Sequence, residues 1–132
     1  MAHKFDVTFE GDHVRAFSAG GKNLKHATAI WKEVVNVCRE HNCYHVLCVS
    51  NSKRPMRIID AYDHAELFQS LGIDKHFRVA WVELAEEAEE STKFITIVLS
   101  NRGLPGQVFG TEEEARRWLL DEPGNMGYLG SE

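Results

Sequence analysis

YHVLCV, residues 44–49, is the stretch of this 132-residue chain that decides the fold class. The run is short, apolar and rich in β-branched residues apart from one histidine, and polar residues bound it on both sides. A strand with one wet face would alternate polar and apolar residues, so a continuous run predicts a strand covered on both faces. Strands of this kind are typical of parallel sheets in α/β proteins.

Toward the N-terminus, the pattern predicts a hairpin followed by a long helix. Residues 4–10 and 13–18 each alternate polar and apolar side chains, and Gly11-Asp12 between them is a turn signal, which indicates two antiparallel strands. Asn23 then offers an N-cap to a helix that ends near His41-Asn42. Its apolar residues recur at steps of three and four: Leu24, Ala27, Trp31, Val34 and Cys38.

Toward the C-terminus, strands and helices alternate. We expect a helix from about Ile58 to Leu71 that stops at Gly72, a strand over residues 77–84, and a short strand over residues 107–109. Thr111 has capping-box spacing to Glu114 and begins a last helix. Residues 93–100 are ambiguous, because their β-branched content favours a strand and their length favours a helix.

The order of elements is therefore ββαβαβαβα. It predicts one α/β domain over residues 1–120, with a mostly parallel mixed sheet opened by an antiparallel hairpin, and a flexible tail over residues 121–132. Right-handed crossovers place the loops that follow the parallel strands along one edge of the sheet. Ligands of α/β proteins usually bind at that edge.

Composition excludes several classes of protein. Hydrophobic residues make up 43% of the chain and charged residues 27%, which is ordinary for a globular domain. The net charge of −5 argues against nucleic acid as a partner. From the sequence we expect no transmembrane segment and no signal peptide. Three cysteines, an odd number, favour free thiols and a cytoplasmic location.

The final third of the chain resembles a known family. Residues 77–119, FRVAWVELAEEAEESTKFITIVLSNRGLPGQVFGTEEEARRWL, together with the order of elements, are similar to the SpoIIAA-like family, relatives of the STAS (sulfate transporter and anti-sigma-factor antagonist) domains. The resemblance implies that residues 87–102 form a helix. STAS domains often carry a phosphorylatable serine between an aspartate and a glycine after the third strand. Here the junction reads Val49-Ser50-Asn51-Ser52, without the aspartate and the glycine, so we expect no phosphorylation switch at Ser50 or Ser52.

The residues after the buried strand are the best candidate site. They precede a helix N-terminus, which favours anions, and they supply hydroxyl, amide and cationic groups. The alternative is a solvated loop that caps the helix. We predict a non-enzymatic STAS-like module that binds a protein partner or a small anionic ligand; the alternative is a protein or enzyme that binds a phosphorylated or acidic metabolite, or a lipid. The expected ligand-binding residues are Ser50, Asn51, Ser52, Lys53, Arg54 and Arg57.

Other constellations favour ordinary structural roles, and we expect no catalytic residue, metal or cofactor. Residues 20–23 resemble a phosphate-binding loop but lack its spacing, so a turn is expected. The glutamates of residues 83–90 fit a solvated first turn of a helix. No close-spaced ligand pair of a zinc site occurs among Cys38, His41, Cys43, His45 and Cys48, and we expect Cys38 and Cys48 in the core. An exposed sheet edge predicts a weak homodimer.

Overall fold

The sheet has five strands in the sequential order β1-β2-β3-β4-β5. The computed structural model describes residues 4–20, 24–52 and 58–120. Pairing is antiparallel between β1 and β2 and parallel everywhere else, so the predicted α/β domain with an opening hairpin is confirmed. The elements are β1 (Lys4–Phe9), β2 (Val14–Gly20), α1 (Leu24–His41), β3 (His45–Ser52), α2 (Ile58–Leu71), β4 (Arg78–Glu83), the 3₁₀ turn η1 (Glu86–Ala88), α3 (Glu89–Asn101), β5 (Gln107–Phe109) and α4 (Glu112–Leu120).

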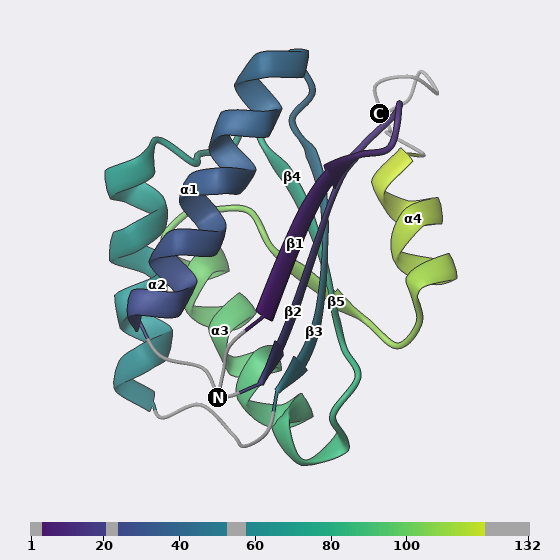
Figure 1. Cartoon of the computed structure of the whole chain (residues 1–132). Helices are drawn as coiled ribbons and strands as arrows, with labels where there is room; N and C mark the ends of the chain where they lie inside the picture. Colours follow the sequence, from purple (N-terminus) through teal and green to yellow (C-terminus); the bar gives the residue numbers. More distant parts are fainter. Residues whose placement is uncertain (1–3, 21–23, 53–57, 121–132) are drawn as a thin grey trace, which may run out of the picture.

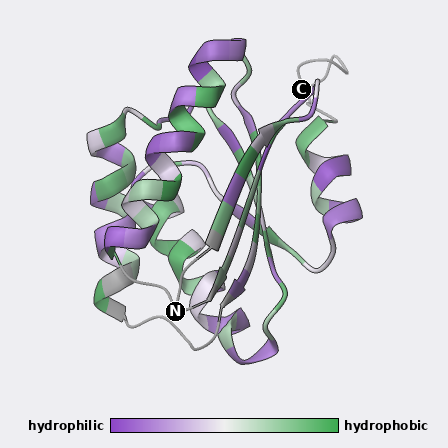
Figure 2. Ribbon diagram, in the orientation of Figure 1, coloured by the Kyte–Doolittle hydropathy of each residue, from purple (hydrophilic) through white to green (hydrophobic). Residues whose placement is uncertain are grey.

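Three helices cover one face of the sheet and one helix covers the other. α1, α2 and α3 lie side by side on the first face, and α4 packs alone on the second (Figure 1). Each new parallel strand is added at the same side of the sheet, and each crossover is right-handed. All three crossover helices therefore lie on the first face. α4 carries its hydrophilic residues on the side away from the sheet (Figure 2).

Each face of the sheet has its own apolar core. β3 contributes to both, because successive side chains of a strand point to opposite faces. Val46 and Cys48 pack under α1 to α3, and Leu47 and Val49 pack under α4. All four are buried, which confirms a strand covered on both faces within YHVLCV, although the strand begins at His45 and leaves out Tyr44. Trp31, Phe68 and Trp81 are buried in the larger core.

Two strands end later than expected. β3 continues through Ser52, so residues 50–52 belong to the strand and not to a loop. Parallel pairing explains this difference, since Ser50 lies opposite Ser18 of β2 and Glu83 of β4. β2 likewise runs on to Gly20, although we expected the pattern to break at Ala19. Parallel pairing of residues 18–20 with residues 50–52 outweighs the weak strand propensity of these small residues.

The ambiguous residues 93–100 are helical, within α3. Ile95, Val98 and Leu99 are buried on one side of the helix, and Ile97 is exposed on the other. Their packing against the sheet decides in favour of the helix. None of the described helices is long and apolar enough to cross a membrane.

Candidate functional site

Three polar residues lie side by side where the parallel strands end. Ser18 of β2 pairs with Ser50 of β3, and Ser50 pairs with Glu83 of β4. Paired residues share a face of the sheet, so all three side chains point toward α1, α2 and α3. This is the carboxyl end of the parallel strands, the usual place for a ligand in an open α/β sheet.

Glu83 is the centre of a hydrogen-bond network that joins three elements. Its Oε1 accepts hydrogen bonds from Ser50 Oγ at 2.9 Å and from Thr92 Oγ1 of α3 at 3.0 Å. Its Oε2 accepts the backbone N–H of Ala85 at 3.1 Å. The expectation that residues 83–90 form a solvated first turn is therefore wrong for Glu83, which is half-buried at the end of β4. Hydroxyl and amide donors replace water around the Glu83 carboxylate and so offset the cost of its partial burial.

A small cavity lies next to this network. Its volume is about 20 Å³. Serine and histidine side chains of β2, α1, β3 and α2 form its polar lining, and largely apolar side chains of α1, β3 and β4 form the rest. The lining residues are Ser18, His26, Ala27, Ile30, Trp31, Cys48, Ser50, His64 and Trp81.

The polar groups around the cavity are almost completely buried. Ser18 Oγ and His26 Nε2 are 3.4 Å apart, and the ring of Phe5 meets the ring of His26 edge-on. Ser18, His26, Ser50 and His64 each expose less than a tenth of their surface. Buried polar side chains in such number are unusual in the core of a small domain, because each must replace its lost hydration.

One residue that lines this cavity carries a donor without an acceptor among the described residues. Trp81 is 1% exposed, and its Nε1 makes no hydrogen bond to the part of the chain that the structure describes. Its indole lies edge-on to Trp31 with ring centroids 5.6 Å apart, and 6.3 Å from the imidazole of His64. A buried N–H without an acceptor is rare in native proteins and calls for a specific explanation.

The structure separates the predicted site residues. Ser50 points into the cavity, and the side chain of Asn51, its neighbour in the strand, is exposed on the opposite face. Ser52 ends β3, but its side chain lies outside the described atoms. Lys53, Arg54 and Arg57 also lie outside the described residues, as do residues 21–23 of the expected glycine turn.

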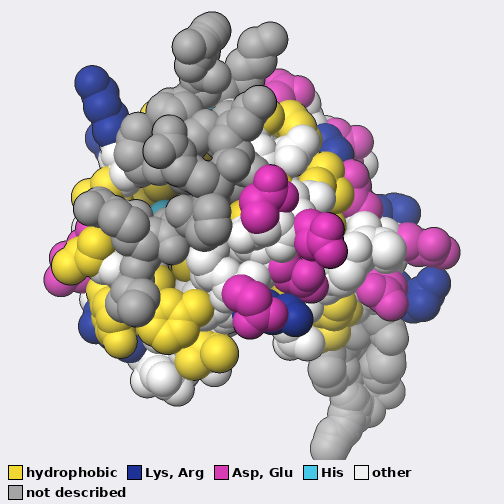
Figure 3. Space-filling view, turned by 90° about the horizontal axis from the view of Figure 1, so that it is seen from below, with side chains coloured by type: hydrophobic (Ala, Val, Ile, Leu, Met, Phe, Trp, Pro, Cys, Tyr) yellow, Lys and Arg dark blue, Asp and Glu magenta, His cyan; other side chains and the backbone are white. Residues whose placement is uncertain are grey.

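The surface at this end of the sheet is partly acidic and partly apolar. Figure 3 looks onto it and shows acidic side chains gathered beside exposed apolar ones. α3 and α4 both begin here with glutamates in the first turn, where the helix dipole favours them. Phe5, which contacts the lining residue His26, and Leu24 at the start of α1 are exposed apolar residues, with 41% and 42% of their surfaces accessible.

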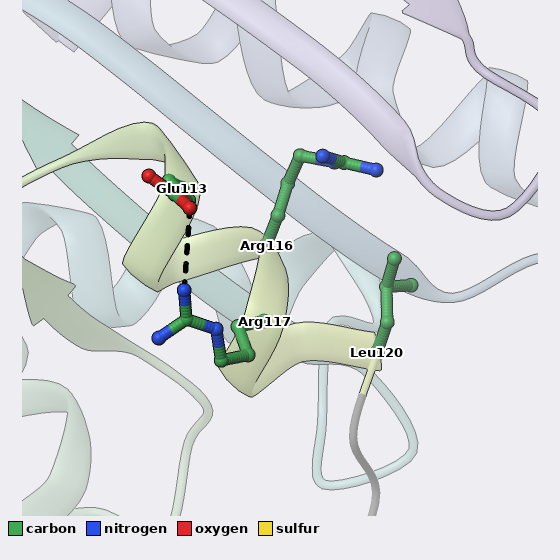
Figure 4. A pocket seen from close by; sticks show the side chains of 4 residues that line it. All are labelled: Glu113, Arg116, Arg117 and Leu120. Carbon is green, nitrogen blue, oxygen red and sulfur yellow. Dashed lines mark hydrogen bonds and ion pairs between the residues drawn. The ribbon is translucent and has the colours of Figure 1, made fainter.

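A larger hollow on the outside of α4 has no comparable chemistry. It measures about 420 Å³ and is lined by Glu113, Arg116, Arg117 and Leu120, which all come from one helix (Figure 4). Arg117 pairs with Glu113 at 3.3 Å, and both side chains are mostly exposed. We therefore place the candidate site at the buried cavity.

Sequence reasoning found Ser50 but missed the other polar residues of the cavity. Ser18 and His26 are eight positions apart, and His64 and Trp81 belong to elements that only the crossovers bring together. A signal was present: His26 is two residues into the helix, next to Ala27 on its apolar face. Cys38 and Cys48 lie in the core as expected, and the described residues hold no cluster of three potential metal ligands.

Comparison with known proteins adds no identification. No family model and no curated protein matches the chain.

Proposed function

We propose that this chain is a non-enzymatic, STAS-like binding module that takes a small ligand at the carboxyl end of its parallel strands. The observation that supports the proposal is the buried polar cavity at that end, with the unsatisfied N–H of Trp81 in its lining. Lys53, Arg54 and Arg57 follow β3 in the sequence and are the cations proposed to hold an anionic part of the ligand.

The buried polar groups favour binding over catalysis. A nucleophile or general base has to reach its substrate within about 3 Å, whereas Ser18 is 5% exposed and His26 is 7% exposed. Glu83 is engaged by Ser50, Thr92 and the backbone of Ala85. These groups hold one another in place, as groups in a rigid binding site do.

A ligand screen with two matched variants tests this function. Backbone amide NMR shifts are recorded for the intact protein against a library of small metabolites. We expect ligands that shift the ends of β2, β3 and β4. Ala27→Val adds two methyl groups at the cavity wall and should abolish binding, whereas Ala29→Val makes the same change at an exposed position of α1 and should not.

Three results would contradict the proposal. The first is a set of shifts confined to the α4 face of the sheet. The second is equal binding by the Ala27→Val and Ala29→Val variants. The third is consumption of a bound metabolite, which would show an enzyme. If a protein and no small molecule shifts these strand ends, the module binds a partner and the small-ligand part of the proposal is wrong.

The same geometry opposes a phosphorylation switch at Ser50. The side chain is 1% exposed and donates to Glu83, so a kinase cannot reach it in the folded protein. A phosphate there would also add negative charge next to a carboxylate. We predict that protein purified from its native cell shows no phosphate on Ser50 by intact-mass measurement and peptide mapping. A stoichiometric phosphate would contradict the prediction.

A further inference from the structure

The orphan N–H of Trp81 constrains what the cavity can hold. An indole N–H only donates, so its partner has to be a hydrogen-bond acceptor. Trp81 is 1% exposed, which leaves bulk water no access to this group. Since buried donors in native proteins are nearly always satisfied by protein, ordered water or ligand, an acceptor inside the cavity accounts for this one.

The size of the cavity limits the occupant to a single small group. A water molecule needs roughly 10–15 Å³ of such space, and the cavity has about 20 Å³. Complete metabolites need pockets more than ten times larger. Only the end of a ligand therefore fits, and the remainder must lie outside the cavity.

Charge around the cavity selects an uncharged acceptor. Ser50 lines the cavity and uses its hydroxyl proton to satisfy Glu83, at 2.9 Å. A carboxylate thus lies directly behind the wall of the cavity. An anionic oxygen placed here would lose its hydration and meet negative charge at short range. A carbonyl oxygen accepts the same hydrogen bond without that repulsion.

The exposed apolar side chains of Phe5 and Leu24 match a short hydrocarbon part of a ligand, next to its carbonyl oxygen. Leu24 lies one turn before Ala27 on the same face of α1, and Ala27 lines the cavity. Phe5 contacts His26, another lining residue, with ring centroids 5.9 Å apart. Both apolar side chains are more than a third exposed, so both are open to contact with a ligand.

We propose that the cavity is the subsite for the neutral carbonyl oxygen of a ligand, an amide, ester or ketone, which accepts the Trp81 Nε1–H hydrogen bond while the attached hydrocarbon lies on Phe5 and Leu24. This inference rests on the proposed function and specifies the chemical group that the site recognises.

Acetamide and acetate provide a matched pair of probes. They have nearly the same shape, and only acetate is charged. The chain has three tryptophans, so the ¹H–¹⁵N spectrum contains three indole resonances, and single Trp→Phe variants at positions 31, 81 and 118 assign them. If the Trp81→Phe variant does not fold, the other two variants assign its resonance by elimination. Trp118 packs on the α4 face and serves as the internal control.

We expect acetamide to shift the Trp81 indole resonance saturably, with acetate at equal concentration and ionic strength giving at most a tenth of the affinity. The Trp118 resonance should stay in place. Ala27→Val should remove the acetamide response and Ala29→Val should keep it. An equal or stronger response to acetate would overturn the choice of a neutral group.

Two further outcomes would overturn the subsite itself. In the first, neither probe moves the Trp81 indole resonance, and magnetisation transfer shows that this N–H contacts a long-lived buried water. The acceptor would then be water alone. The other is a library ligand that shifts the strand ends and leaves Trp81 unchanged. In that last case the proposed function stands and this inference fails, so the two are distinguishable.

Discussion

Glu83 is the residue on which the polar network depends, and replacing it should weaken the fold. Glu83→Gln keeps the shape of the side chain but converts one acceptor oxygen into a donor, so at least one of the bonds from Ser50, Thr92 and Ala85 is lost. A buried polar group that loses its partner costs about 1–3 kcal/mol. We expect a decrease of that size in the free energy of unfolding, measured by urea denaturation.

Glu87→Gln is the matched control for this prediction. Glu87 belongs to the same acidic run but is exposed, and surface substitutions usually change stability by no more than about 0.5 kcal/mol. Equal unfolding free energies for the Glu83→Gln and Glu87→Gln variants would show that the network contributes nothing measurable.

The three cysteines should differ sharply in reactivity. Burial raises the pKa of the Cys38 thiol to about 12, and Cys48 is also buried, whereas Cys43 is partly exposed. Because the thiolate is the nucleophile, a thiol with a raised pKa and no access to solvent reacts slowly. We predict one fast-labelling thiol per native chain and three per chain in denaturant, counted by mass after brief alkylation. Rapid labelling of all three native thiols would be inconsistent with this core.

Single residues were the hardest part of the site to predict from sequence. Ser50 was found because it follows a run of apolar residues, but its neighbours were expected in a loop. Of the side chains that complete the cavity, His26 has a local signal only in its place next to Ala27, and Ser18 and His64 have none. Their proximity is created by strand register and by crossovers, which join residues that are far apart in the chain.

At the scale of elements, α4 is fastened to the opening hairpin by one ion pair. Arg15 Nη2 of β2 lies 2.8 Å from Glu112 Oε2, and Arg15 Nε donates to Oε1 at 3.1 Å. The Arg15 hydrogen bonds lower the pKa of Glu112 below its ordinary 4.5, although burial acts in the opposite direction. The pair ties the first turn of α4 to a strand 97 positions earlier.

This ion pair predicts a small, pH-dependent contribution to stability. A carboxyl group whose pKa is lowered on folding stabilises the fold above its unfolded pKa, and this stabilisation is lost as the pH falls through the folded value. Both side chains are about a third exposed or more, so solvent screening limits the effect to about 0.5–1 kcal/mol. Glu112→Gln should lower the unfolding free energy by that amount at neutral pH, with no difference from wild type well below pH 4.5.

Glu113→Gln provides the comparison for this prediction. Glu113 pairs with Arg117 across one turn of α4, and these side chains are 82% and 69% exposed. Its replacement should leave stability unchanged at every pH. A Glu112→Gln effect that persists unchanged at low pH would show that packing at this position, and not charge, fastens α4.

Elements were predicted well wherever periodicity was strong. α1 begins at Leu24 and ends at His41, because its apolar stripe extends over the whole helix. α4 begins after Thr111, whose Oγ1 accepts the backbone N–H of Glu114 at 3.1 Å, as the capping-box spacing predicts. Residues 93–100 were undecidable locally, since β-branched residues occur in both strands and buried helices. Tertiary packing of Ile95 and Leu99 settles that segment.

At the scale of the whole molecule, the sheet has two edges of unequal length. β1 offers six residues and β5 offers three. An edge strand leaves backbone N–H and C=O groups unpaired along its outer side, and another chain can pair with them. The longer edge can form more hydrogen bonds, so the weak homodimer expected from the sequence should form through β1 of each copy about a two-fold axis.

The strength of this dimer should depend on salt. Each copy carries a net charge of −5, so two copies repel each other, and added salt screens that repulsion. We predict a monomer in dilute, low-salt solution and a growing dimer fraction as concentration and salt rise, measured by sedimentation. Backbone amides of β1 should then exchange more slowly with solvent, while those of β5 remain unchanged. A monomer at every concentration would exclude the dimer, and slowed exchange at β5 instead would place the interface at the opposite edge.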